Sequence, residues 1–155
     1  MAFDAFLKLD GVPGESVDAK HKGEIEVLSF SWGATQPGVA NGTPSRNAKA
    51  QIDTMTIIKR VDKASPLLML QSCGGSSLPN ATLTVRKNID DGQASEFLKV
   101  KLSDVVISGV SAGGNSQTDQ LPLEQLSLNF SKLEISVLSD AGEVSVGSCG
   151  PGFSK

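Results

Sequence analysis

Alternation of apolar and polar residues with a period of two dominates the chain and predicts β-strands. Seven stretches carry this pattern: 3–9, 25–32, 51–61, 81–89, 95–102, 105–110 and 123–138. Segments rich in Gly, Pro, Asn and Asp separate them, and Asp90-Asp91-Gly92 is typical of a hairpin turn. The pattern therefore predicts a mainly β protein of antiparallel strands.

One segment, residues 64–74, predicts an α-helix. Ser65 is suited to cap the first N–H groups, and Pro66 fits the first helical position because it has no N–H group to lose. Four consecutive apolar residues follow, so we expect the helix to be buried. Six or seven strands with one helix packed against them predict a small β-barrel or a two-sheet sandwich.

Two predicted strands have an interrupted alternation. In 25–32, Glu26 shares the parity of the apolar Leu28, so the first half of this stretch fits the pattern less well. In 123–138, apolar residues up to Phe130 share one parity and those from Leu133 take the other. A bulge near Ser131-Lys132 would restore a single buried face. Without a bulge, the strand would leave its own core and meet a neighbour.

The length of 155 residues predicts one domain, which we place at 1–140, followed by a flexible C-terminal tail at 141–155. Residues 10–23 are polar throughout and predict a long exposed loop. Residues 33–49 hold three Gly, two Pro and two Asn and have too little apolar surface to become ordered alone. Connections of this length are usually functional or disordered.

The charge balance excludes several classes of function. Fourteen Lys and Arg against 17 Asp and Glu give a net charge of −3, which argues against nucleic-acid binding because a binder normally needs a basic face. No apolar run approaches the roughly 20 residues that span a bilayer. The N-terminus lacks the basic start and apolar middle of a signal peptide. With two cysteines, the chain has no disulfide framework.

No pattern in the sequence predicts catalysis, a metal site or a cofactor. The one histidine, His21, lies between two lysines and is expected to be a plain surface residue. Cys73 would lie at the C-terminal end of the helix, where no dipole activates a thiol. Basic residues in Lys59-Arg60, Arg86-Lys87 and 99–101 alternate with acids and predict solvated faces. We therefore expect a protein that is not an enzyme.

Six blocks of sequence in register resemble the haemolysin-coregulated protein (Hcp) family, which forms the tube of the bacterial type VI secretion system. The resemblance runs from about residue 2 to residue 138. The blocks are 6–16 (FLKLDGVPGES), 21–22 (HK), 25–33 (IEVLSFSWG), 63–70 (KASPLLML), 105–108 (VVIS) and 124–134 (EQLSLNFSKLE). The short tail after Ser139 and the absence of Tyr depart from the family pattern.

The resemblance implies a β-barrel with one helix, six copies of which close into a ring. Stacked rings would form a hollow tube that a contractile sheath propels, tipped by a spike protein of the VgrG type. Effector proteins would travel inside the tube. The chain would lie in the bacterial cytoplasm before firing and then leave the cell without a signal peptide.

A tube subunit needs one sheet face that meets a water-filled channel. Alternate positions of 81–89 and of 25–32 carry small or polar side chains and are candidates to face this lumen, unless they belong to the ordinary outer surface. The candidate lumen residues are Ser29, Ser31, Thr82, Thr84, Arg86 and Asn88.

The two long loops are the candidates for contacts between rings or subunits, unless they are free surface loops. The candidate contact residues are Glu15, Asp18, Lys20, His21, Lys22, Gln36, Asn41 and Arg46. Strands at sheet edges have unpaired backbone groups, which a cyclic assembly satisfies by pairing with the next subunit. We expect strand 123–138 to make this lateral contact.

A second class of function is a monomeric β-sandwich that binds a carbohydrate or a peptide. Such a module needs exposed aromatic platforms, and the chain offers one Trp and six Phe, mostly at core positions of the alternation. A hydrolase on a β scaffold is disfavoured because no catalytic constellation is present.

Overall fold

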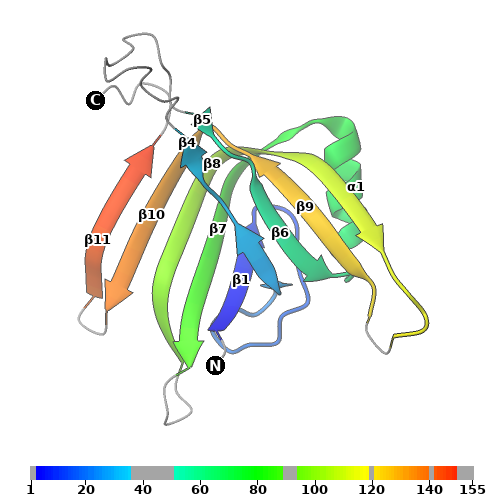
Figure 1. Cartoon of the computed structure of the whole chain (residues 1–155), viewed down its shortest axis with the longest axis horizontal. Helices are drawn as coiled ribbons and strands as arrows, with labels where there is room; N and C mark the ends of the chain where they lie inside the picture. Colours follow the sequence, from blue (N-terminus) through cyan, green and yellow to red (C-terminus); the bar gives the residue numbers. More distant parts are fainter. Residues whose placement is uncertain (1–2, 36–50, 89–93, 119–120, 140–141, 150–155) are drawn as a thin grey trace, which may run out of the picture.

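The computed structural model describes residues 3–35, 51–88, 94–118, 121–139 and 142–149, and its elements are shown in Figure 1. The chain forms eleven strands and one helix within these ranges. They are β1 (Phe3–Leu9), β2 (Ile25–Val27), β3 (Ser29–Ser31), β4 (Ala34–Thr35), β5 (Gln51–Ile52), β6 (Met55–Arg60), α1 (Ser65–Gly74), β7 (Ser77–Asn88), β8 (Ala94–Gly113), β9 (Leu123–Asn129), β10 (Lys132–Ser139) and β11 (Gly142–Cys149). The prediction of a mainly β fold with one helix is confirmed.

The main sheet closes on itself. Its strands follow the order β2-β1-β7-β8-β9-β6-β3, and all pairs are antiparallel. Only Leu28 separates β2 from β3, so one stretch of chain pairs with β1 through its first half and with β6 through its second. The break at Leu28 explains the interrupted alternation of 25–32, since the strand changes its partner there.

The sheet also branches at β8, which is one strand of 20 residues rather than the two predicted at 95–102 and 105–110. Its first half pairs with β10 and its second half with β9. Asp104 marks the switch, with a positive φ of 51°. The amide of Ser131 donates to the Ser103 carbonyl at 2.9 Å, and the Ser131 hydroxyl donates to Asp104 Oδ2 at 2.8 Å.

The predicted strand 123–138 is therefore two strands that meet at this switch. The interruption at residues 130–131 restores one buried face, because Leu126 and Leu128 before it and Leu133 after it all face the core. β9 is paired on both sides by β8 and β6, and β10 by β8 and β11. The prediction that 123–138 offers a lateral edge is wrong, because neither strand has a free backbone edge.

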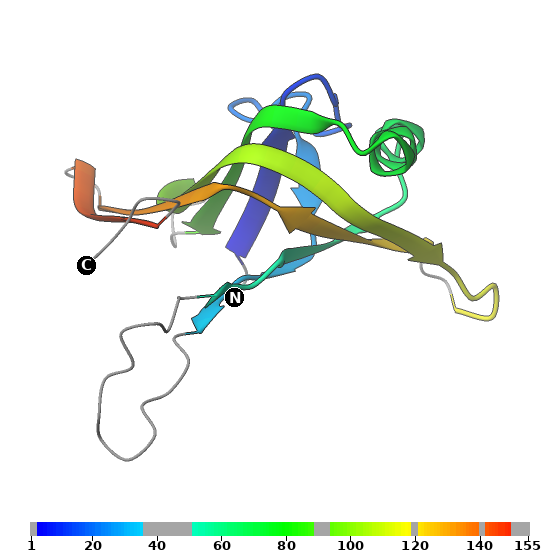
Figure 2. The same ribbon diagram turned by 90° about the horizontal axis from the view of Figure 1, so that it is seen from above.

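The edge of the branch is β11. Residues 142–149, predicted as part of a flexible tail, pair in antiparallel register with β10. The sheet thus continues past residue 140, and in Figure 2 β10 and β11 extend away from the barrel.

Helix α1 spans Ser65–Gly74, close to the prediction, but its orientation to solvent is not as expected. Ala64 is the N-cap residue and no side chain caps the helix, so the predicted cap at Ser65 is wrong. Gly75 ends the helix in the left-handed region, with φ of 67°, and its amide donates to the Gln71 carbonyl at 3.0 Å. Leu68 is the one helix residue that is buried; its apolar neighbours are exposed.

Candidate interaction surfaces

The polar loop at residues 12–24 is compact and covers one face of the sheet. The Gly14 amide donates to the Gly23 carbonyl at 2.8 Å, and the Ser16 amide donates to the Glu24 carbonyl at 3.0 Å. The two sides of the loop lie so close that a Cβ atom at Gly14 would stand 2.4 Å from the Glu24 carbonyl oxygen. A glycine is therefore required at this position.

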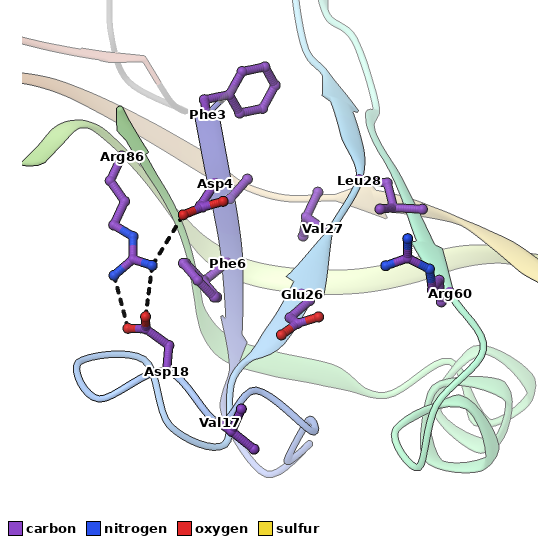
Figure 3. Close-up of a pocket in the computed structure, with 11 residues that line it drawn as sticks. Phe3, Asp4, Phe6, Val17, Asp18, Glu26, Val27, Leu28, Arg60 and Arg86 are labelled. Atoms are coloured by element: carbon purple, nitrogen blue, oxygen red, sulfur yellow. Dashed lines mark hydrogen bonds and ion pairs between the residues drawn. The ribbon is translucent and has the colours of Figure 1, made fainter. Parts of the chain in front are cut away.

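Arg86 on β7 ties the loop to the sheet. Its Nη1 donates to Asp18 Oδ2 at 2.9 Å, and its Nη2 donates to Asp18 Oδ1 at 2.7 Å and to Asp4 Oδ2 at 3.3 Å (Figure 3). The bidentate hydrogen bond from Arg86 lowers the pKa of Asp18 from 3.8 to about 2, assisted by backbone N–H groups of Lys20 and His21. The same pair raises the pKa of Arg86.

His21 is a buried residue of this contact, so its prediction as a plain surface residue is wrong. Its ring stacks on Phe6 at a centroid distance of 4.6 Å, and Arg86 lies over the same Phe6 ring at 4.8 Å. Its Nδ1 is within hydrogen-bond distance of Glu24 Oε2, and its Nε2 lies 3.0 Å from Glu96 Oε1 on β8. His21 thus joins the loop to both β1 and β8.

The structure does not bring the six candidate lumen residues together on one open face. Ser29 and Ser31 are exposed on β3, whereas the other four lie on β7, which β1 separates from the β2–β3 stretch. On β7, Asn88 is exposed and Thr82 is half-buried. Thr84 and Arg86 are buried, so in this chain they do not meet open water.

Some of the candidate contact residues are exposed, and others are bonded within the chain. Lys20, Lys22 and Glu15 are exposed, and Glu15 Oε1 accepts a hydrogen bond of 2.8 Å from the Lys63 amide next to α1. Asp18 and His21 are engaged within the chain as described above. Gln36, Asn41 and Arg46 lie outside the described residues.

Beside the loop, a groove of about 430 Å³ opens between β1, β2 and β6 (Figure 3). The exposed apolar side chains of Phe3, Val17 and Leu28 line it, together with the charged groups of Glu26 and Arg60. Sequence patterns gave no sign of this groove, because its residues come from segments that the topology alone brings together.

Lys59 and Arg60 are adjacent on β6, but Arg60 lines the groove and Lys59 lies in the interior. Lys59, predicted on a solvated face, is fully buried. Its Nζ donates to Glu124 Oε2 at 2.7 Å, to Asp62 Oδ1 at 2.9 Å and to the Arg60 carbonyl at 2.9 Å. The hydroxyl of Ser65, the first residue of α1, also donates to Glu124 Oε2, at 2.6 Å. This buried network fixes the start of the helix to β6 and β9.

Within the described part of the chain, no group of three or more His, Cys, Asp or Glu side chains is arranged to hold a metal ion. Across the same residues, no helix combines the length and the apolar character that a bilayer crossing demands. What the described surface offers is a groove, a branched sheet and an exposed helix, all of which suit contact with other macromolecules.

Comparison with known proteins defines the class. The family model "Type VI secretion system effector, Hcp" matches residues 6–137. Protein hcp1 from Pseudomonas aeruginosa is 38% identical over 136 residues, covering 87% of this chain and 83% of that protein. The crystal structure of Hcp1 from Salmonella typhimurium has a TM-score of 0.79 at 31% identity, with 97% of this chain and 95% of that chain covered.

A crystal structure of a type VI secretion system effector from Yersinia pestis has the same TM-score of 0.79 at 29% identity, over 95% of this chain and 99% of that one. The chain therefore belongs to the Hcp family of the type VI secretion system. Proteins of this family are secreted and structural, and they are not enzymes. The sequence-based prediction of the family is confirmed.

Proposed function

We propose that this chain is the tube subunit of a type VI secretion system, in which six copies close into a ring and rings stack into a hollow tube. The family, which implies hexameric tube assembly, supports this proposal, as does the similarity over residues 6–137. The structure adds one observation that carries it: the core-facing side of the sheet continues beyond the barrel, and there the described residues do not cover it.

Three cross-strand rows of side chains make this visible. In one row, Leu7, Leu83 and Val100 are buried, Ile135 on β10 is half-buried, and the row ends at the exposed Gly147 on β11. A second row runs from the buried Ala5 and Val85 through the half-buried Leu98 to Val137, which is 43% exposed, and the exposed Ser145. A third ends with Leu133 and Cys149.

An apolar sheet face is stable when another layer covers it. Within the chain the barrel covers the rows as far as β8, and beyond β8 the described residues leave Ile135 and Val137 partly open. Among the described strands β11 pairs with β10 alone, so its other edge offers backbone groups to a further strand or chain. A subunit that is completed by copies of itself accounts for both features.

The partners of the tube follow from this role. Rings stack on one another, a spike protein of the VgrG type caps the tube, a sheath surrounds it, and effector proteins travel in its lumen. The chain is made in the bacterial cytoplasm and leaves the cell through the type VI secretion system.

The candidate lumen surface is reduced to Ser29, Ser31, Thr82 and Asn88, the four predicted residues that reach solvent in the chain. Replacing Ser31 with Trp would place a bulky ring on an exposed position of β3. We expect this variant to form rings as the unchanged protein does and to retain less effector in a pull-down. Unchanged effector retention would remove Ser31 from the lumen.

Size-exclusion chromatography with light scattering tests the assembly, followed by negative-stain microscopy for ring symmetry. The tube subunit should give a particle of six times 16.1 kDa, whereas a monomeric binding module for a carbohydrate or peptide would stay at 16.1 kDa. A single-chain particle at every concentration and salt would refute the proposed function.

A further inference from the structure

The outer side of helix α1 is apolar and carries no charge. The helix sequence SPLLMLQSCG contains no charged residue. With Leu68 buried against the barrel, a repeat of 3.6 residues per turn places Pro66, Leu70 and Cys73 opposite it, with Met69 at the border. Leu70 is 66% exposed and Met69 is 47% exposed. A surface helix normally carries polar side chains on this side.

The sheet face on β10 and β11, which the described residues leave uncovered, has matching properties. It begins at Leu98 on β8, continues with Ile135 and Val137 on β10, and ends with the small residues Ser145, Gly147 and Cys149 on β11. None of these six carries a formal charge. A Cβ atom added at Gly147 would meet no other atom within 4 Å, so there is free space above this face on β11. Its shape and chemistry suit an apolar helix lying across the strands.

The two surfaces lie at opposite ends of the molecule. Along the longest axis in Figure 1, α1 is at one end, and β10 and β11 are at the other; Figure 2 shows the same separation from above. A helix cannot reach the sheet extension of its own chain across that distance. Two different surfaces at opposite ends of one protomer are the arrangement that head-to-tail contact needs, and head-to-tail contact closes into a ring.

We infer that the outer side of α1 of one copy packs on the uncovered face of β10 and β11 of the next copy. This contact adds a helix layer to the sheet where the barrel stops covering it. It also explains why the outer side of the helix carries apolar side chains. The inference rests on the proposed ring and names the two surfaces that meet in it.

The native cysteines make the contact testable without new residues, because Cys73 lies on the helix surface and Cys149 lies on the sheet surface. A short bismaleimide should join Cys73 of one copy to Cys149 of the next and give a ladder of covalent oligomers up to the full ring. Cys73→Ser and Cys149→Ser should each abolish the ladder. A mixed assembly of the two single variants should give covalent dimers and nothing larger.

Other results would overturn the inference. A ladder that survives in either single variant means contact between like surfaces, and cross-linking confined to one chain means that the chain covers its own sheet. If the ring is intact and both thiols react with the maleimide but do not become cross-linked, other surfaces meet in the ring. The proposed tube function would then still stand. Absence of the ring itself, measured first by light scattering, is the separate failure of the proposed function.

A matched pair of variants gives an independent readout. Val137 faces the uncovered side of the extension, and Val146, 51% exposed, faces the reverse side of the same two strands. Val137→Asp and Leu70→Asp should each raise the concentration at which rings dissociate by about tenfold or more, since each buries a charge in the contact. Val146→Asp should leave it unchanged, and circular dichroism should show all three folded. Dissociation by Val146→Asp alone would contradict the inference.

Discussion

The polar loop at 12–24 and helix α1 have the reverse of the solvent exposure that their compositions suggest. The loop has many charged residues, yet His21 is buried and Asp18 is held by Arg86. The helix has none, yet its outer side is open to solvent. Each segment is fixed to the barrel at one side: the loop through ion pairs and a ring stack, the helix through Leu68 and the Lys59 network.

The difference shows that composition indicates whether the side chains of a segment need polar or apolar partners. It does not indicate whether those partners come from the same chain or from another copy. The acidic side chains Glu15, Asp18 and Glu24 of the loop find their partners within the chain. The apolar outer side of the helix has none within the described residues, and the proposed ring would supply it from another copy. Four predictions test this contrast.

The largest effect is expected at the base of the helix. Glu124→Ala removes the more buried of the two carboxylates that Lys59 contacts and leaves Asp62 alone to pair with the buried ammonium, so the free energy of unfolding should fall by about 3 kcal/mol in a urea titration. Replacing both residues, Lys59→Met with Glu124→Leu, should recover most of this loss, because neither of the two most deeply buried charges then remains and Asp62 keeps its hydrogen bond from the Ala64 amide. A single variant as stable as the unchanged chain would mean that the network does not hold the helix.

The two sides of the helix should respond differently to truncation. Leu68→Ala opens a cavity against the barrel and should lower the free energy of unfolding by about 2–5 kcal/mol. Leu70→Ala removes an exposed side chain and should change it by less than about 0.5 kcal/mol. Both are to be measured at a concentration below that at which rings dissociate. Equal losses would show that the chain itself covers the outer side of the helix.

Arg86→Ala should release the loop from the sheet and cost about 1–2 kcal/mol, as expected for the loss of a charge-assisted hydrogen-bond pair. Limited trypsin digestion should then cut faster after the exposed Lys20 and Lys22. Arg86→Lys keeps the charge without the two-pronged geometry and should give an intermediate rate. Identical digestion of all three proteins would mean that the loop is held by other contacts.

Local patterns were sufficient for the fold class, most strand positions, the helix bounds and the family. They failed where partners are distant in the chain: Arg86 and Asp18 are 68 residues apart, His21 and Glu96 are 75 apart, and Lys59 and Glu124 are 65 apart. No periodicity relates such positions, so each charged side chain appears solvated when its sequence neighbours alone are considered.

The sheet extension was missed for another reason. β11, with sequence GEVSVGSC, is short in large apolar residues and pairs mainly through its backbone, which side-chain alternation does not report. The exposed helix was missed because an apolar segment predicts burial without specifying whether its own chain or a second copy provides the cover.

The smallest predicted effect concerns Asp18 and depends on pH. Arg86 holds the pKa of Asp18 at about 2 in the folded chain, below its ordinary 3.8, so the ion pair stabilises the fold above about pH 4. This contribution is lost as the pH falls toward 2, where the folded-state carboxylate also becomes protonated. The urea midpoints of the unchanged chain and Asp18→Asn should therefore differ at neutral pH and converge between about pH 4 and pH 2.

In an Arg86→Ala background the same substitution should have a smaller pH-dependent effect, because the main cause of the lowered pKa is gone. A constant difference at all pH values would mean that the loop is held by its shape and by the His21 stack, and that charge contributes nothing to its difference from the helix.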